Sequence, residues 1–218
     1  MKEKTYFISF EGIDGSGKDT QLFELLKNIK EDNNYPFGNK YSNIYVTREP
    51  TRTTKSGIEI SDLIRTTNVD GKTASKLYIQ DRIEHTKSIR EILKFSHVLT
   101  SRYDISTLTY QVAQGEDFDE LYKLHKFNSL EGSITPDISL IFEIPVEISF
   151  KRINKRGEVT ECFEKIEFQK KLIDSQDYCL NRLKEKGRKI IRINANQTVK
   201  EVTREMLEKI NQFILNSY

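Results

Sequence analysis

The sequence predicts an α/β protein in which a parallel β-sheet is flanked by helices. Five short runs rich in β-branched and aromatic residues recur along the chain, with helical patterns between them. Several of these runs are almost continuously apolar, which is typical of strands buried on both faces of a parallel sheet. A glycine-rich segment directly follows the first run and precedes a helical pattern. Strands that alternate with helices in this way favour right-handed crossover connections.

The expected strands are Tyr6–Phe10, Asn43–Thr47, His97–Thr100, Ile138–Ile144 and Lys189–Ile193. Apolar residues at helical spacing predict four helices: one around 22–29, a long one over roughly 74–94, one around 163–173 and a last one after Thr198. The last is the clearest, because Thr198 and Glu201 form a capping-box pattern. Its apolar stripe is interpreted as core packing and consists of Val199, Val202, Met206, Ile210 and Phe213. Segments 31–42, 50–57 and 154–161 are expected to be loops.

Composition narrows the class of protein. The length of 218 residues fits one domain, and we treat 1–218 as a single unit. The formal net charge of +2 gives no support for a nucleic-acid groove. The two cysteines, Cys162 and Cys179, form neither a metal-ligand spacing nor a disulfide framework. No apolar stretch approaches the ~20 residues of a membrane span, so the sequence predicts a cytoplasmic protein that binds neither nucleic acid nor membrane.

The strongest motif is Gly12-Ile13-Asp14-Gly15-Ser16-Gly17-Lys18, which has the G-x-x-x-x-G-K spacing of a phosphate-binding loop between a strand and a helix. Glycines allow the backbone to curl so that consecutive N–H groups point at phosphate oxygens. The N-terminus of the following helix adds positive potential. We expect Lys18 to place its ammonium on the β- and γ-phosphates of a nucleotide.

The residue after the lysine departs from the usual pattern. Ser or Thr normally follows, and its hydroxyl binds Mg²⁺. Here Asp19 follows, and Thr20 comes next. A carboxylate is a good hard ligand for magnesium, but it adds negative charge beside a triphosphate. The base-reading pattern of GTPases, Asn-Lys-x-Asp, is absent, because 154–157 read Asn-Lys-Arg-Gly.

Five segments in order resemble thymidylate kinases and together cover nearly the whole chain. They are Phe10–Lys18, Thr47-Arg48-Glu49-Pro50, Leu77–Arg82, Ser101-Arg102-Tyr103 with Thr107, Tyr110 and Gln111, and Pro136–Leu140. The resemblance implies a three-layer P-loop kinase fold with strand order 2-3-1-4-5 and a short lid at 151–161. It also implies transfer of the γ-phosphoryl group of ATP to dTMP, a requirement for Mg²⁺, and a homodimer.

The resemblance also implies roles on the ATP side. The loop residues Gly12, Asp14, Gly15, Ser16, Gly17, Lys18, Asp19 and Thr20 would hold the ATP phosphates. Arg102 would bridge the donor and acceptor phosphates. Gly15 has no side chain, so the further catalytic cation would come from the lid as Arg156 or Arg152. Adenine would lie near Asn194-Ala195-Asn196.

On the dTMP side, Arg52 would hold the phosphate because a guanidinium grips two oxygens, with Glu49 nearby and Arg48 as a weaker candidate. Tyr78 would stack on thymine, and Arg82, one turn later, would bond the pyrimidine edge. The remaining contacts would come from four residues: Thr107 and Gln111 reading the base, Tyr110 excluding a 2′-hydroxyl, and Asp14 accepting the 3′-hydroxyl.

Two departures from the family occur as a pair. The family has Asp-Arg-Tyr where this chain has Ser101-Arg102-Tyr103, and this chain has Asp19 where a hydroxyl is expected. We hypothesise that Asp19 and Ser101 flank one Mg²⁺ and have exchanged roles. The alternative is two independent changes that weaken catalysis.

Three other functions remain open at this point. The chain could be a kinase of the same fold for another acceptor, such as dUMP, dGMP or a deoxynucleoside. It could bind nucleotides without turnover, or act as a regulatory P-loop switch.

Overall fold

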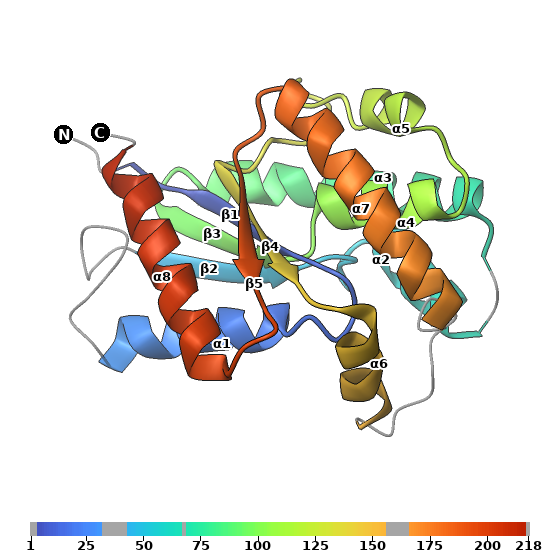
Figure 1. Ribbon diagram of the computed structural model, residues 1–218. Coiled ribbons are helices and arrows are strands. Elements are labelled where there is room, and N and C mark those ends of the chain that lie inside the picture. Colours follow the sequence, from blue (N-terminus) through green and yellow to red (C-terminus); the bar gives the residue numbers. More distant parts are fainter. Residues whose placement is uncertain (1–3, 32–42, 67–68, 156–165, 217–218) are drawn as a thin grey trace.

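The computed structural model describes residues 4–31, 43–66, 69–155 and 166–216, and these contain one five-stranded sheet (Figure 1). All strand pairs are parallel and the order is β2-β3-β1-β4-β5, which confirms the predicted α/β class and strand order. The strands are β1 (Phe7–Glu11), β2 (Asn43–Arg48), β3 (Ser96–Ser101), β4 (Ile138–Glu143) and β5 (Ile190–Asn194).

Helices cover both faces of the sheet. They are α1 (Lys18–Glu31), α2 (Lys55–Thr66), α3 (Gly71–Ile92), α4 (Asp104–Ala113), α5 (Phe118–Leu124), α6 (Val146–Asn154), α7 (Ile166–Glu185) and α8 (Val199–Leu215). In Figure 1, α1 and α8 lie together on one face, and they contact each other as well as β1 and β5. On the other face α3 packs on β3, and α4 lies between α3 and α7.

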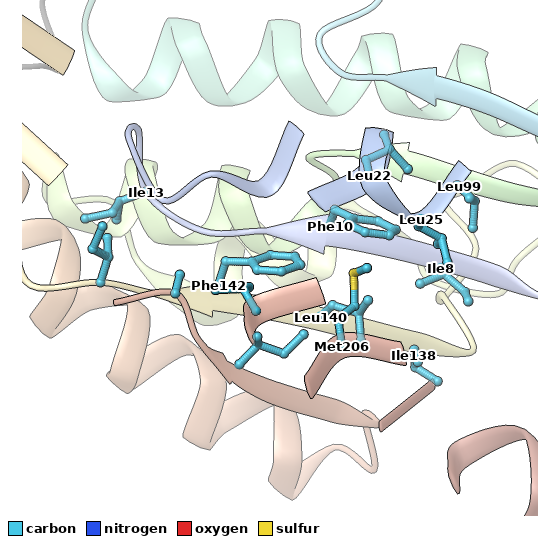
Figure 2. Packing of buried hydrophobic residues seen from close by; sticks show 14 of the residues in the cluster. Ile8, Phe10, Ile13, Leu22, Leu25, Leu99, Ile138, Leu140, Phe142 and Met206 are labelled. Carbon is cyan, nitrogen blue, oxygen red and sulfur yellow. The ribbon is translucent and has the colours of Figure 1, made fainter. Parts of the chain in front are cut away.

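Alternating side chains of the central strands form a core on each face. Phe10 of β1 stacks on Phe142 of β4, with ring centroids 5.8 Å apart. Figure 2 shows these rings beside Leu140 and close to Met206 of α8. On the opposite face, Phe7 meets the edge of the Tyr103 ring at 5.0 Å. The central strands are therefore buried on both sides, as their apolar sequences predict.

The first and last predicted helices are confirmed. At the start of α8, Thr198 and Glu201 form the predicted capping box. Val202, Met206 and Ile210 of its stripe are buried, whereas Val199 is 48% exposed and does not belong to the core. The long helix predicted over 74–94 is α3, and α7 extends to Glu185, well past the predicted 173. Phe163, which contributed to that pattern, lies outside the described residues.

The loop expected over 50–57 is shorter than predicted. Residues 55–57 form the first turn of α2 and not a loop, since Gly57 donates its N–H to Thr54 Oγ1 at 2.9 Å. Residues 151–154, at the start of the expected lid, are the last turn of α6, and 156–161 lie outside the described residues. Strand β2 is an edge strand with half-exposed side chains, unlike the fully buried β1 and β3.

The topology places the ends of three strands side by side. β1 ends at Glu11, β2 at Arg48 and β3 at Ser101, and the three strands are neighbours in the sheet. Segments that follow these ends therefore meet at one edge, where open α/β sheets bind ligands. Within the described residues, no helix is both long and apolar enough to cross a membrane.

Candidate active site

The loop between β1 and α1 is curled tightly, and two of its glycines cannot be replaced without collision. Gly12 has φ +145°, and a Cβ on it would lie 2.7 Å from the carbonyl oxygen of Phe142. Gly15 has φ +77°, and its Cβ would lie 2.7 Å from the carbonyl oxygen of Ser149 in α6. The loop thus has the left-handed turns and close backbone approach that a phosphate-binding loop requires.

Lys18 is the first residue of α1 and is buried beneath this loop. Its Nζ lies 3.9 Å from Asp14 Oδ1. Burial, followed by the charge of Arg102, lowers the pKa of Lys18 to about 8. The lysine is therefore an ammonium at neutral pH whose charge is only partly compensated, which suits it to a bound anion.

A cleft of about 330 Å³ opens beside the loop. Five arginines from five different segments line it: Arg48, Arg52, Arg65, Arg82 and Arg102. Of the predicted residues, those that line it are Asp14, Gly15, Gly17, Lys18, Asp19, Thr20, Glu49, Arg52, Tyr78, Arg82, Arg102, Thr107 and Tyr110. The cleft is thus strongly cationic and also offers an aromatic ring, Tyr78.

Asp14 belongs to the phosphate loop and also lines this cleft. Its carboxylate accepts a very short hydrogen bond from Arg102 Nη2 and another from Tyr110 Oη at 2.7 Å. Burial opposes ionisation, but the charges of Arg102 and Lys18 outweigh it and lower the pKa of Asp14 to about 2. Arg102 itself follows β3 with a left-handed backbone, φ +63°. An aspartate and an arginine, both expected to contact substrates, therefore hold each other in place.

Arg82 lines the cleft and belongs to a buried polar network. Its Nε donates to Glu49 Oε2 at 2.7 Å and its Nη2 donates to Thr107 Oγ1 at 2.8 Å. The second carboxylate oxygen of Glu49 lies 2.9 Å from Nδ1 of His85. Burial disfavours the charge of Arg82, but the Glu49 carboxylate raises its pKa above the usual value. Glu49 was expected near the acceptor phosphate, and its carboxylate is already engaged by Arg82 and His85.

Asp19 and Ser101 are in direct contact. The hydroxyl of Ser101, at the end of β3, donates a very short hydrogen bond to Asp19 Oδ1 in the first turn of α1. Burial opposes the ionisation of Asp19, but the charge of Lys18 and the bond from Ser101 lower its pKa. A carboxylate and a hydroxyl beside a phosphate loop are both hard oxygen donors, which fits Mg²⁺. No cluster of three or more His, Cys, Asp or Glu is found among the described residues, and magnesium bound to nucleotide phosphates needs none.

A second, smaller cleft of about 220 Å³ lies on the other side of the same loop. Gly15, Ser16 and Gly17 line it together with Ala195 and Gln197, which follow β5. Arg152 spans this cleft from α6, because Nη1 donates to Gly15 O at 3.3 Å and Nη2 donates to Ala195 O at 3.2 Å. The predicted region for adenine therefore adjoins the phosphate loop.

The remaining predicted residues differ in their exposure and in whether they line the cleft. Arg52 is exposed at the cleft, and Tyr78 is half-buried in it. Gln111 is buried outside the cleft lining, and its amide has no hydrogen-bond partner in the described part of the chain. Arg156 lies outside the described residues.

The fold brings three further residues to the site that the sequence does not identify. Arg65 of α2 lines the main cleft, and Ser106 donates to Glu11 Oε2 at 2.6 Å while also lining it. His125, at the end of α5, lies 2.8 Å from Arg82 Nη1. Nothing near these residues in the sequence marks them, because each is recruited by tertiary packing.

Comparison with known proteins agrees with this architecture. A family model described as thymidylate kinase matches residues 10–206. The chain is 34% identical over 209 residues to a probable thymidylate kinase of Methanococcus maripaludis, covering 95% of this chain and 94% of that one. It is 33% identical over 201 residues to a probable thymidylate kinase of Methanocaldococcus jannaschii, covering 92% and 93%.

A solved structure of thymidylate kinase from Candida albicans has a similar fold, with a TM-score of 0.75, 21% identity, and coverage of 98% of this chain and 95% of that chain. The phosphate loop, the arginine-lined cleft beside it and the family match along most of the sequence lead to one conclusion: this chain belongs to the thymidylate kinase family.

Proposed function

We propose that the protein transfers the γ-phosphoryl group of ATP to dTMP, giving ADP and dTDP. The observation that carries this proposal is a pair of clefts on the two sides of one phosphate loop. The smaller cleft leads to Ala195 and fits a donor nucleotide. The larger, with five arginines and Tyr78, fits a second nucleotide whose phosphate faces the first.

Phosphoryl transfer requires alignment and positive charge around the transferring group more than covalent chemistry. Lys18 would contact the β- and γ-phosphates. Arg102 lines the larger cleft and is bonded to Asp14 of the phosphate loop, and it would contact both the donor and the acceptor phosphates. The phosphate of dTMP is already ionised at neutral pH, so no general base is assigned. Arg152 and Arg156 are proposed to supply the further cation when the lid closes and excludes water.

On the acceptor side, we assign the dTMP phosphate to Arg52 and the thymine ring to Tyr78, Arg82 and Thr107. Asp14 would accept the 3′-hydroxyl, and Tyr110 beside it would exclude a 2′-hydroxyl. Gln111 would complete base reading only after its side chain reaches the cleft, because it lies outside the lining.

The experiment is ADP release with ATP, Mg²⁺ and each monophosphate in turn. Strong acceleration by dTMP supports the proposal. An equal response to dTMP, dUMP and dGMP would instead indicate a broader kinase of the same fold. No acceleration by any monophosphate or deoxynucleoside would contradict catalysis and favour nucleotide binding without turnover or a switch protein.

We propose that Mg²⁺ is bound between Asp19 and Ser101, with these two residues having exchanged roles. Their contact supports this, since each would present an oxygen to the same position. When bound, the ion would neutralise charge on the β- and γ-phosphates. The test is the Asp19→Ser, Ser101→Asp double variant. Under the exchange hypothesis it is more active than either single variant, and equal or lower activity would contradict it.

Family membership also leads us to propose a single-domain homodimer that acts in the cytoplasm. Sedimentation equilibrium tests the dimer, and a monomer at micromolar concentration would contradict it.

A further inference from the structure

The guanidinium of Arg82 is almost fully committed to protein partners. An arginine has five N–H bonds. The Nε bond goes to Glu49, and Nη2 lies 2.8 Å from Thr107 Oγ1 and 2.6 Å from Glu49 Oε2. One Nη1 bond goes to His125 at 2.8 Å. Among the described residues, this leaves a single N–H without a partner, and it belongs to Nη1.

His125 is fixed as a hydrogen-bond acceptor toward Arg82. Its Nδ1 lies 2.7 Å from the backbone carbonyl oxygen of Leu121, which can only accept, so Nδ1 carries the hydrogen. In a neutral ring Nε2 then has a free lone pair and accepts from Arg82 Nη1. Burial, followed by the adjacent charge of Arg82, lowers the pKa of His125 to about 3, so the ring stays neutral.

The imidazole is itself held rigidly. It is fully buried, and it stacks on Phe127 with ring centroids 4.9 Å apart and planes within 4°. On the guanidinium side, the ring of Tyr103 lies 4.9 Å from Arg82 Cζ and covers one face. The rotation of the guanidinium is therefore determined by Glu49, Thr107, His125 and Tyr103 together.

We propose that His125 is a positioning residue for acceptor specificity: it takes one hydrogen of Arg82 Nη1 and leaves the other for the base in the cleft. This rests on the proposed function, in which Arg82 reads the pyrimidine edge. A single fixed N–H donor favours a base with a carbonyl at that edge, such as thymine or uracil. Cytosine presents an amino group at ring position 4, and two donors facing each other are unfavourable.

The test compares three variants with the wild type. His125→Phe keeps an aromatic ring but removes the acceptor, and His125→Gln restores an acceptor at a similar distance from the backbone. His97→Phe is the matched control: His97 is also buried and accepts a hydrogen bond, from the Tyr6 N–H at 3.0 Å, but does not line the cleft. Steady-state kinetics with ATP and either dTMP or dCMP gives KM, kcat and the ratio of kcat/KM values for each protein.

His125→Phe is expected to raise KM for dTMP by about fivefold or more, because it removes a hydrogen bond to a charged group. The ratio of kcat/KM for dTMP over dCMP should fall, while KM for ATP changes less than about twofold. His125→Gln should recover most of the loss, and His97→Phe should change neither KM for dTMP nor the ratio. If His125→Phe behaves like His97→Phe, or if His125→Gln loses as much as His125→Phe, the positioning role is wrong.

Two further measurements separate this inference from the proposed function and from misfolding. The proposed function is overturned if the wild-type protein does not bind dTMP in calorimetry and does not release ADP faster with dTMP. If the wild type binds dTMP and turns it over, but His125→Phe has unaltered kinetics, only the role of His125 is overturned. Nitrogen NMR of the wild type reports the ring directly. An Nδ1–H tautomer from pH 6 to 8 is expected, and an Nε2–H tautomer or an imidazolium contradicts the proposal even if no variant folds.

Discussion

The two sides of the active-site region are constructed in contrasting ways. The phosphate loop consists of consecutive residues from Gly12 to Lys18, and the groups it offers are mainly backbone N–H. The Arg82 network is assembled from residues that lie 33, 25 and 43 positions away in the chain, namely Glu49, Thr107 and His125.

This difference predicts which kind of substitution disrupts each side. The phosphate loop depends on backbone geometry, so it should fail when a side chain is added. The Arg82 network depends on the compensation of buried charge, so it should fail when a side chain is removed. Four predictions test this contrast.

The largest effect is expected on the buried pair. Arg82→Met leaves the carboxylate of Glu49 buried with His85 as its remaining partner, which should lower the free energy of unfolding by about 3–5 kcal/mol. Urea denaturation measures it. Adding Glu49→Gln should recover part of the loss, and strictly additive losses would show that the two side chains are not coupled. The matched control is Lys94→Met in the exposed Lys94–Glu91 pair, which should leave the midpoint unchanged.

The next effect concerns the backbone of the loop. Gly15→Ala places a Cβ 2.7 Å from the Ser149 carbonyl oxygen, so the loop must move, and ATP affinity should fall by about a hundredfold or more. Gly187→Ala is matched in backbone conformation, with φ +79° against +77°, but meets nothing within 4 Å. It should cost about 1 kcal/mol of stability and leave ATP affinity unchanged. Calorimetric ATP affinities that fall equally in both variants would contradict the steric argument.

A smaller effect depends on pH. Because the pKa of Lys18 is lowered from 10.5 to about 8, the free enzyme loses this charge as pH rises through about 8. ATP requires the charged form, so its affinity should fall above pH 8, by at most about tenfold per pH unit, and binding should take up a proton. Calorimetry in two buffers of different ionisation enthalpy measures that uptake. Lys18→Arg stays charged, so its ATP binding should show no such uptake.

The smallest effect is expected at Tyr110. Tyr110→Phe removes the O–H that donates to Asp14 Oδ2 at 2.7 Å but keeps the ring. We expect kcat/KM for dTMP to fall about threefold to tenfold, the usual range for one hydrogen bond to a charged group. Tyr122→Phe, outside the cleft lining, should leave kcat/KM unchanged. If kcat/KM for dTMP falls equally in Tyr122→Phe and Tyr110→Phe, the loss does not come from the hydrogen bond to Asp14.

The strands, the phosphate loop and the last helix could be predicted because each depends on nearby residues. Helix α4 could not be predicted from periodicity: seven of its ten residues are buried, including Asp104, Thr107 and Gln111, so it has no continuous polar face. Some of its buried polar groups have distant partners, such as Arg188, whose Nη1 donates to Asp104 Oδ2 at 2.6 Å.

The same limit applies to the candidate site. The family motif identified Arg82, but nothing in the sequence around His125 indicates that α5 brings its imidazole to that guanidinium. The proximity of Asp19 and Ser101 follows from the sequence, because both occupy motif positions that the topology brings to one edge of the sheet, whereas their exchange of roles around Mg²⁺ stays a prediction.

The position of Asp14 has a thermodynamic consequence. It belongs to the donor loop by sequence, yet its carboxylate is bonded to Arg102 and Tyr110 of the acceptor cleft. A change that one nucleotide causes in this carboxylate alters the binding of the other nucleotide. The affinities for ATP and dTMP are therefore linked. By reciprocity, the factor by which ATP changes the dissociation constant of dTMP must equal the factor by which dTMP changes that of ATP.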